Sequence, residues 1–290
     1  MMDMELTKLI TTFLKYLEDK ECSHYTVTQY RTILVDLQRF LEEDILNGRA
    51  YLEHIELDHL QMYMSERKKR GNCAKTRSMV LQVMRTFWNY LYKRRYICNN
   101  MPQQLDDIKV EKRERVYLTQ KEFHCLLDVI ENETIRAVAY TLGYTGLRIS
   151  ELKALSVKDV DFENEEIKVL CGKGKKGRTV PLHPVLKPVL QKYFNEIRNQ
   201  DSRHFFATKR SGTITQQYVN NSLIKAANKA GIEKHVTAHI LRHSFASGLV
   251  SENCNITVIQ KLLGHADLKT TSIYLHVNRK EMENAVKMLK

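Results

Sequence analysis

The chain has 290 residues, of which 43% are hydrophobic, so it can form one large hydrophobic core or two ordinary ones without the help of disulfides or metals. Lysine and arginine number 46 against 34 acidic residues, and the resulting net charge of +12 favours a polyanionic partner, most often a nucleic acid, over an ordinary basic protein. The six scattered cysteines include no CxxC pair, which argues against a disulfide framework and a zinc knuckle. No signal peptide or apolar run of about 18 residues is present, so we expect a cytoplasmic, nucleoid-associated protein.

The first third of the chain is expected to be an all-helical, DNA-binding domain over residues 1–98. Apolar residues recur at helical spacing in four stretches, 5–20, 26–43, 56–71 and 74–95. Gly71 follows a basic turn and should end the third helix.

A basic stretch begins in that third helix. No acidic residue occurs between Arg67 and Leu105. A solvated surface usually mixes both signs of charge, so this stretch favours phosphate contacts over a merely solvated basic face. The candidate DNA-contacting residues are Arg67, Lys68, Lys69, Arg70, Lys75 and Arg77.

Residues 99–116 are polar and charged and are expected to link two domains. The second domain, 117–290, begins with a helix for which Thr119 and Glu122 form a plausible capping box. A strand–turn–strand pattern follows over 162–183, and the remainder has helical spacing. The expected fold is therefore mainly α, with a small antiparallel β-sheet in the second domain.

The turn within 162–183 reads GKGKKGRTVPL and matches the GxGxxG pattern of dinucleotide-binding proteins. That reading fails because the pattern needs a helix after its third glycine, whereas RTVPL is typical of a strand. A tight hairpin with basic residues at its tip could deliver an ammonium group to a phosphate, although a solvated turn is the simpler alternative. The basic residues of this turn are Lys173, Lys175, Lys176 and Arg178.

Three further motifs carry residues suited to phosphate chemistry. In TGLRISELKAL, Gly146 ends a helix, Ser150 and Glu151 begin another, and Arg148 at the turn is either a structural ion pair or an anion clamp. In HVTAHILRHSFASGLV, three histidines lie four residues apart, at 235, 239 and 243, and are expected on one helical face, which suggests a metal site. The helix lacks a nearby third ligand of sure identity and an HExxH motif, which argues against zinc.

The pair His239 and Arg242 instead shares a helical face and suits phosphate binding and proton transfer. In VIQKLLGHADLKTTSIYLHV, Gly264 should end a helix just before His265, and Thr270 or Thr271 can cap the short helix that carries Tyr274. An aromatic residue there is either a packing residue or a nucleophile.

Together, and in this order, these motifs resemble the tyrosine recombinase (lambda integrase-like) family, most closely its Xer-like and transposon-borne members. The resemblance covers nearly the whole chain and shows no departure at the catalytic positions. Glu151 matches a residue that usually supports the first arginine. The resemblance implies the catalytic residues Arg148, Lys173, His239, Arg242, His265 and Tyr274.

The same resemblance implies a site-specific recombinase that needs no cofactor or metal and works through a 3′-phosphotyrosyl intermediate and a Holliday junction. Its partner would be duplex DNA with an inverted-repeat core site, held by a two-domain clamp and assembled as a tetramer on two sites. An apolar stripe in the tail should dock on a neighbouring protomer, with packing on its own domain as the alternative: Met282, Ala285, Val286 and Leu289. An accessory protein or partner recombinase fits the same scheme. The alternatives are a type IB topoisomerase and a catalytically silent DNA-binding regulator.

Overall fold

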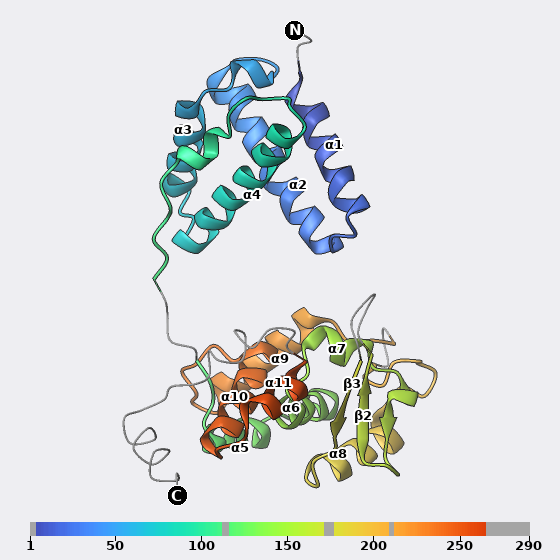
Figure 1. Cartoon of the computed structure of the whole chain (residues 1–290). Helices are drawn as coiled ribbons and strands as arrows, with labels where there is room; N and C mark the ends of the chain where they lie inside the picture. Colours follow the sequence, from blue (N-terminus) through green and yellow to red (C-terminus); the bar gives the residue numbers. More distant parts are fainter. Residues whose placement is uncertain (1–3, 112–115, 171–176, 209–211, 265–290) are drawn as a thin grey trace, which may run out of the picture. The chain divides into compact units, whose positions relative to one another are not determined.

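The computed structural model describes residues 4–111, 116–170, 177–208 and 212–264. The chain divides into two compact units, Met1–Arg113 and Glu114–Lys290 (Figure 1). No helix among the described residues is long and apolar enough to cross a membrane.

The described part of the first unit is built from helices. They are α1 (Leu6–Asp19), α2 (His24–Phe40) with its π-helical extension η1 (Leu41–Ile45), the 3-10 turn η2 (Leu52–His54), α3 (Leu57–Lys69) and α4 (Ala74–Lys93). The Ser23 hydroxyl accepts a hydrogen bond from the Thr26 backbone N–H at 3.1 Å and thereby caps α2. Gly71, with φ of +79°, follows α3 in a conformation that favours glycine, as the sequence predicts.

The core of this unit forms where the apolar faces of the helices meet. Phe13, Leu34, Phe87 and Trp88 have no exposed surface. The rings of Phe13 and Phe87 lie 5.2 Å apart between their centroids, which joins α1 to α4. These four buried residues lie within the stretches where apolar residues recur at helical spacing.

The segment after α4 packs against the core of the first unit before the chain continues toward the second unit. The 3-10 turn η3 (Met101–Gln104) packs on the N-terminal core through Met101, and Leu105 joins it there. Arg85 anchors the segment: it donates hydrogen bonds to the carbonyls of Pro102 at 3.1 Å and Leu105 at 2.6 Å. The first part of the expected linker thus lies against the N-terminal unit.

The second unit begins with α5 (Gln120–Asp128), α6 (Glu133–Thr145), α7 (Ile149–Ala154), η4 (Val157–Asp159), β1 (Val160–Asp161), β2 (Glu166–Val169) and β3 (Arg178–Pro181). It continues with α8 (Leu186–Lys192), its π-helical extension η5 (Tyr193–Ile197), α9 (Gln216–Lys229), α10 (Ala238–Ser251) and α11 (Ile256–Leu263). The capping box expected at α5 forms, because the Thr119 backbone N–H donates to Glu122 at 2.7 Å and the Glu122 N–H to the Thr119 hydroxyl at 3.2 Å. The predicted fold class is confirmed.

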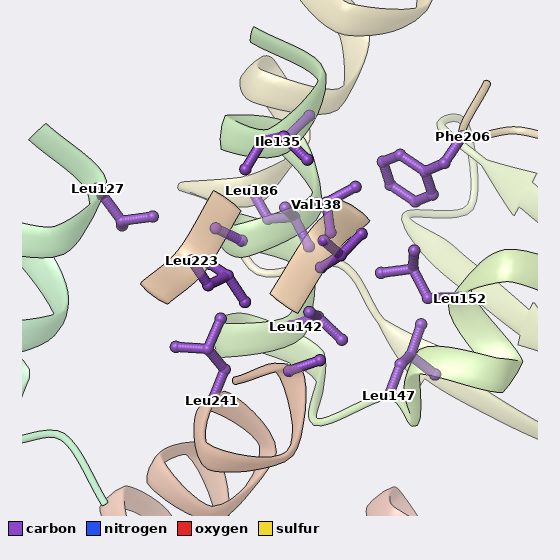
Figure 2. Packing of buried hydrophobic residues seen from close by; sticks show 14 of the residues in the cluster. Leu127, Ile135, Val138, Leu142, Leu147, Leu152, Leu186, Phe206, Leu223 and Leu241 are labelled. Carbon is purple, nitrogen blue, oxygen red and sulfur yellow. The ribbon is translucent and has the colours of Figure 1, made fainter. Parts of the chain in front are cut away.

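Helix α6 lies at the centre of the second unit and packs against α8, α9 and α10. Its side chains Ile135, Val138 and Leu142 are at most 1% exposed. Figure 2 shows them among Leu223 of α9 and Leu241 of α10. A helix that is apolar on most sides must be buried, which explains why α6 forms the axis around which the other elements are placed.

The strands form one antiparallel sheet in the order β1–β2–β3. Ile167 pairs with Val180, and Val169 pairs with Arg178. Ile167, Val169 and Val180 are buried, so they define the core face of the sheet. Because side chains alternate along a strand, Arg178 lies on the same face as Val180, two residues further on.

Candidate active site

In the second unit, the end of α6, the start of α7 and part of α10 bring Arg148, Glu151 and Arg242 close together. Helix α6 ends at Gly146, whose φ of +62° turns the chain sharply toward α7. Arg148 is the N-cap residue of α7, and Glu151 lies in its first turn. Helix α10 carries Arg242 and packs against both α6 and α11.

Glu151 is the centre of the cluster. Its Oε1 accepts hydrogen bonds from Arg148 Nη1 at 2.8 Å and Arg178 Nη1 at 2.9 Å. Its Oε2 accepts from the Arg148 backbone N–H and from Arg178 Nη2, both at 2.8 Å. The four acceptor positions of the carboxylate are therefore filled. Arg242 Nη1 lies 3.8 Å from Oε2, close enough for an ion pair.

Burial by itself would raise the pKa of the Glu151 carboxyl. The hydrogen bonds from Arg178 and Arg148 outweigh burial and lower this pKa to about 2. Glu151 is therefore ionised at neutral pH. Its single negative charge faces three guanidinium groups, so the cluster keeps two formal positive charges, which suits it to bind an anion.

The three arginines also converge on the C-terminal end of α11. Arg178 Nε donates to the Leu262 carbonyl at 2.6 Å, Arg242 Nη2 to the Leu263 carbonyl at 2.7 Å, and Arg148 Nη2 to the Gly264 carbonyl at 3.4 Å. The last carbonyls of a helix have no partner within the helix, and cationic side chains stabilise that end. Three successive carbonyls are thus satisfied by three arginines from different elements.

Arg148 and Arg242 differ in exposure. The Arg148 side chain is 42% exposed, whereas the Arg242 side chain is 3% exposed. Arg242 Nη1 also donates to the Gly146 carbonyl at 2.5 Å. The sequence suggested that Arg148 forms either a structural ion pair or an anion clamp; it forms the ion pair with Glu151 and is also accessible to an anion. Arg242, in contrast, is buried and held by backbone carbonyls.

The two histidines of α10 flank Arg242 in the sequence but differ in exposure. His239 is exposed and His243 is buried, and their ring centroids are 4.2 Å apart. The expected row of three histidines on one helical face is wrong, because Thr237 caps α10 and places His235 before the helix. Within the described residues, no group of three His, Cys, Asp or Glu side chains could hold a metal ion.

Arg178 lies elsewhere than expected. The sequence places it at the solvent-facing tip of the hairpin, but it begins β3, on the core face, and its side chain is 10% exposed. Its donors bind Glu151 and the end of α11 instead of facing solvent. Several other expected site residues lie outside the described residues: Lys173, Lys175, Lys176, His265 and Tyr274.

The basic residues of the first unit fall into two groups. Arg67 Nη1 binds Asp36 Oδ2 at 2.7 Å, and Arg70 Nη1 binds Asp36 Oδ1 at 3.2 Å. Arg77 Nε donates to the carbonyl of residue 72 at 3.2 Å. Lys68, Lys69 and Lys75 are exposed, and so is Arg70, whose side chain is 41% exposed although it binds Asp36. The lysines therefore offer accessible positive charge for phosphates, and Arg70 adds to it.

Known proteins match this chain over most of its length. Residues 116–281 match the model of the phage integrase family, and residues 10–95 match that of its N-terminal SAM-like domain. Tyrosine recombinase XerC of Oceanobacillus iheyensis is 30% identical, over 97% of this chain and 95% of its own length. Tyrosine recombinase XerD of Haemophilus influenzae is 30% identical, over 97% of each.

Solved structures show the same fold at lower identity. The Tn1549 transposon integrase in complex with a circular intermediate DNA has a TM-score of 0.79 at 21% identity, over 99% of this chain and 100% of that one. A lambda integrase dimer bound to a core site has a TM-score of 0.77 at 20% identity, over 93% of this chain and 77% of that one.

Proposed function

The chain belongs to the phage integrase family as a Xer-like tyrosine recombinase, and from that premise we propose that it cuts and rejoins DNA strands through a 3′-phosphotyrosyl intermediate and a Holliday junction. The observation that carries the proposal is the convergence of Arg148 and Arg242 on the end of α11, with a surplus of positive charge. The sequence places His265 directly after that end. DNA is the substrate, and the tasks open to such an enzyme are resolution, integration and excision.

The two arginines hold the scissile phosphate. Arg148 presents its exposed face to the non-bridging oxygens, and Arg242 completes the clamp, with His265 as a further donor. Charge-assisted hydrogen bonds to a phosphate become stronger as negative charge develops on its oxygens during displacement. Two guanidiniums supply the positive charge that metal ions supply in other nucleases, so the reaction is expected to proceed in EDTA.

Tyr274 is the nucleophile. Its phenolate oxygen attacks phosphorus and forms a phosphotyrosyl bond, while the bond from phosphorus to the 5′ oxygen breaks. Lys173 gives a proton to the departing 5′ oxygen, and His239 accepts or positions the proton of the tyrosine. The energy of the broken bond is kept in the adduct, so the reverse attack by a 5′ hydroxyl rejoins the strand without ATP.

The protein is proposed to act on inverted-repeat core sites as a tetramer on two DNA duplexes. Exposed lysines of the first unit, at 68, 69 and 75, contribute phosphate contacts, and the apolar stripe of the tail docks on a neighbouring protomer. Deleting residues 281–290 should then abolish recombination but not DNA binding. Unchanged recombination after this deletion would refute docking of the tail between protomers.

The first test is covalent trapping. A core site is selected from random duplexes by binding, built into a nicked suicide duplex, and incubated with the protein in EDTA. We expect a protein–DNA adduct on a denaturing gel that is absent with Tyr274→Phe. Specific binding without an adduct would contradict the proposed catalysis and favour a silent DNA-binding regulator. Relaxation of supercoiled DNA without a defined site would favour a topoisomerase instead.

A further inference from the structure

Arg178 is held on both edges of its guanidinium. Nη1 and Nη2 bind the two oxygens of Glu151 at 2.9 and 2.8 Å, and Nε binds the Leu262 carbonyl at 2.6 Å. The side chain is 10% exposed. Paired, parallel hydrogen bonds of this kind fix the orientation of both the guanidinium and the carboxylate. Nothing in the proposed chemistry gives Arg178 a role.

The contacts of Arg178 join three separate elements. It begins β3, its carboxylate partner lies in α7, and its carbonyl partner lies at the end of α11. The next two carbonyls of that end, Leu263 and Gly264, accept from Arg242 and Arg148. The bond from Arg178 to Leu262 therefore ties the helix end to β3 and α7 and helps to fix its position relative to both other arginines.

Charge gives Arg178 a second effect. Without it, the Glu151 carboxylate would face only Arg148, at 2.8 Å, and Arg242, at 3.8 Å. One negative charge would then offset one of the two guanidiniums needed for the phosphate. With Arg178 bound to both carboxylate oxygens, the charge of Glu151 is balanced within the protein.

We propose that Arg178 is a positioning residue for strand cleavage, which neutralises Glu151 and fixes the end of α11 so that Arg148 and Arg242 keep their charge and orientation for the scissile phosphate. This inference rests on the proposed roles of those two arginines. Since Arg178 lies on the core face of the sheet, its loss should change the rate of cleavage and leave the affinity for DNA unaltered.

The test compares Arg178→Met with the double variant Arg178→Met/Glu151→Gln. Band shifts on the selected core duplex give the affinity, and single-turnover adduct formation on the suicide duplex gives the rate. We expect Arg178→Met to bind DNA like the wild type and to cleave about 100-fold more slowly, the size of effect that misplaced catalytic groups produce. The double variant, which lacks both charges, should recover about tenfold of that rate.

Arg198→Met is the matched control. Arg198 is also buried, 6% exposed, and donates from Nε and Nη2 to the His204 carbonyl at 3.3 and 3.2 Å, but none of its hydrogen-bond partners belongs to the Glu151 cluster. The Arg198→Met substitution should lower the stability of the protein and leave the cleavage rate of the folded fraction unchanged. A structural role for Arg178 alone would make the two variants behave alike.

Three results would overturn the inference. They are a wild-type cleavage rate in Arg178→Met, a parallel loss of affinity and rate, and no recovery in the double variant. If Arg178→Met does not fold, Arg178→Lys replaces it, because one ammonium cannot satisfy both carboxylate oxygens and the Leu262 carbonyl, and a wild-type rate would again overturn the inference. Failure of the wild type itself to form an adduct would contradict the proposed function instead.

Discussion

Arg242 reaches from the middle of α10 to the turn that ends α6 and donates a 2.5 Å hydrogen bond to the carbonyl of Gly146. This turn directly precedes Leu147 and Arg148, so the arginine deepest in the site holds the backbone that presents the exposed one. The left-handed conformation of Gly146 aims its carbonyl at Arg242. One buried guanidinium thereby serves both the fold and the proposed phosphate clamp.

The first prediction separates these two duties. Arg242→Gln and Arg148→Gln should each reduce adduct formation by about 100-fold or more, because each removes one donor to the developing charge. Arg242→Gln should also destabilise the second unit more than Arg148→Gln does, by about 1–3 kcal/mol, because it leaves the Gly146 and Leu263 carbonyls without this buried donor.

Hydrogen exchange of peptides from α6 measures this difference, since that helix forms the core of the second unit. The fluorescence of Trp88, the single tryptophan, reports on the first unit and serves as the internal control. Equal protection of α6 in the two variants would contradict a structural duty of Arg242.

The second prediction concerns acid. The pKa of Glu151 is lowered from 4.5 to about 2, so its ionised form stabilises the folded state. A depressed pKa gives stability that is fully present above about pH 4.5 and is lost as the pH falls toward 2. For a shift of this size the contribution at neutral pH is about 3 kcal/mol.

Urea unfolding followed by circular dichroism, repeated between pH 7 and 2.5, measures this contribution. The difference in unfolding free energy between the wild type and Glu151→Gln should stay constant above about pH 4.5 and shrink below it. A difference that does not change with pH would show that the carboxylate charge is not what stabilises the cluster.

Local patterns were sufficient for much of this architecture. Helical spacing predicted the buried faces of the helices, the capping box at Thr119 formed as expected, and Gly71, Gly146 and Gly264 each follow or end a helix in the left-handed conformation. These features depend on residues within a few positions of one another, which is the range over which sequence patterns carry structural information.

The role of Arg178 could not be read in the same way. Its neighbours in GKGKKGR are basic and glycine-rich, so the residue resembled part of the turn, whereas its partner Glu151 is 27 positions away. One local signal did exist: Arg178 and Val180 are two residues apart in a strand, and therefore on one face. His235 was expected on the same helix as His239 and His243 because the three are evenly spaced. The helix starts after Thr237, so His235 lies outside it.

The third prediction tests how tightly Arg178 lies against α11. Gly264 has φ of +62°, and a Cβ there would lie 2.7 Å from Arg178 Nη1 and 3.1 Å from its Cδ and Cζ. Gly264→Ala should therefore cost more than the about 1–2 kcal/mol of a left-handed alanine, and should slow adduct formation, because Arg178 must move away from its partners.

Gly231→Ala is the matched control for this substitution. Gly231 has φ of +68° and nothing within 4 Å of an added Cβ, so it carries the backbone cost without the contact. Chemical unfolding and adduct formation are measured for both variants. Equal destabilisation and equal rates would mean that the end of α11 can shift without disturbing Arg178.

The fourth prediction distinguishes lysines from arginines in the first unit. Lys69 is exposed, whereas the Arg67 side chain is 17% exposed and binds Asp36 at 2.7 Å. If Lys69 contacts a phosphate, Lys69→Met should reduce the slope of log affinity against log salt by about 0.9. Arg67→Met should change that slope less and should instead lower the stability of the first unit, because Asp36 loses a close partner.

Band shifts at several salt concentrations give the slopes, and urea unfolding followed by Trp88 fluorescence gives the stability of the first unit. Lys8→Met is a suitable reference, since Lys8 is exposed on α1 and lies outside the basic stretch. An equal change of slope in Arg67→Met and Lys69→Met would mean that Arg67 exchanges Asp36 for a phosphate when DNA binds. The accessible charge of α3 would then be greater than the free protein shows.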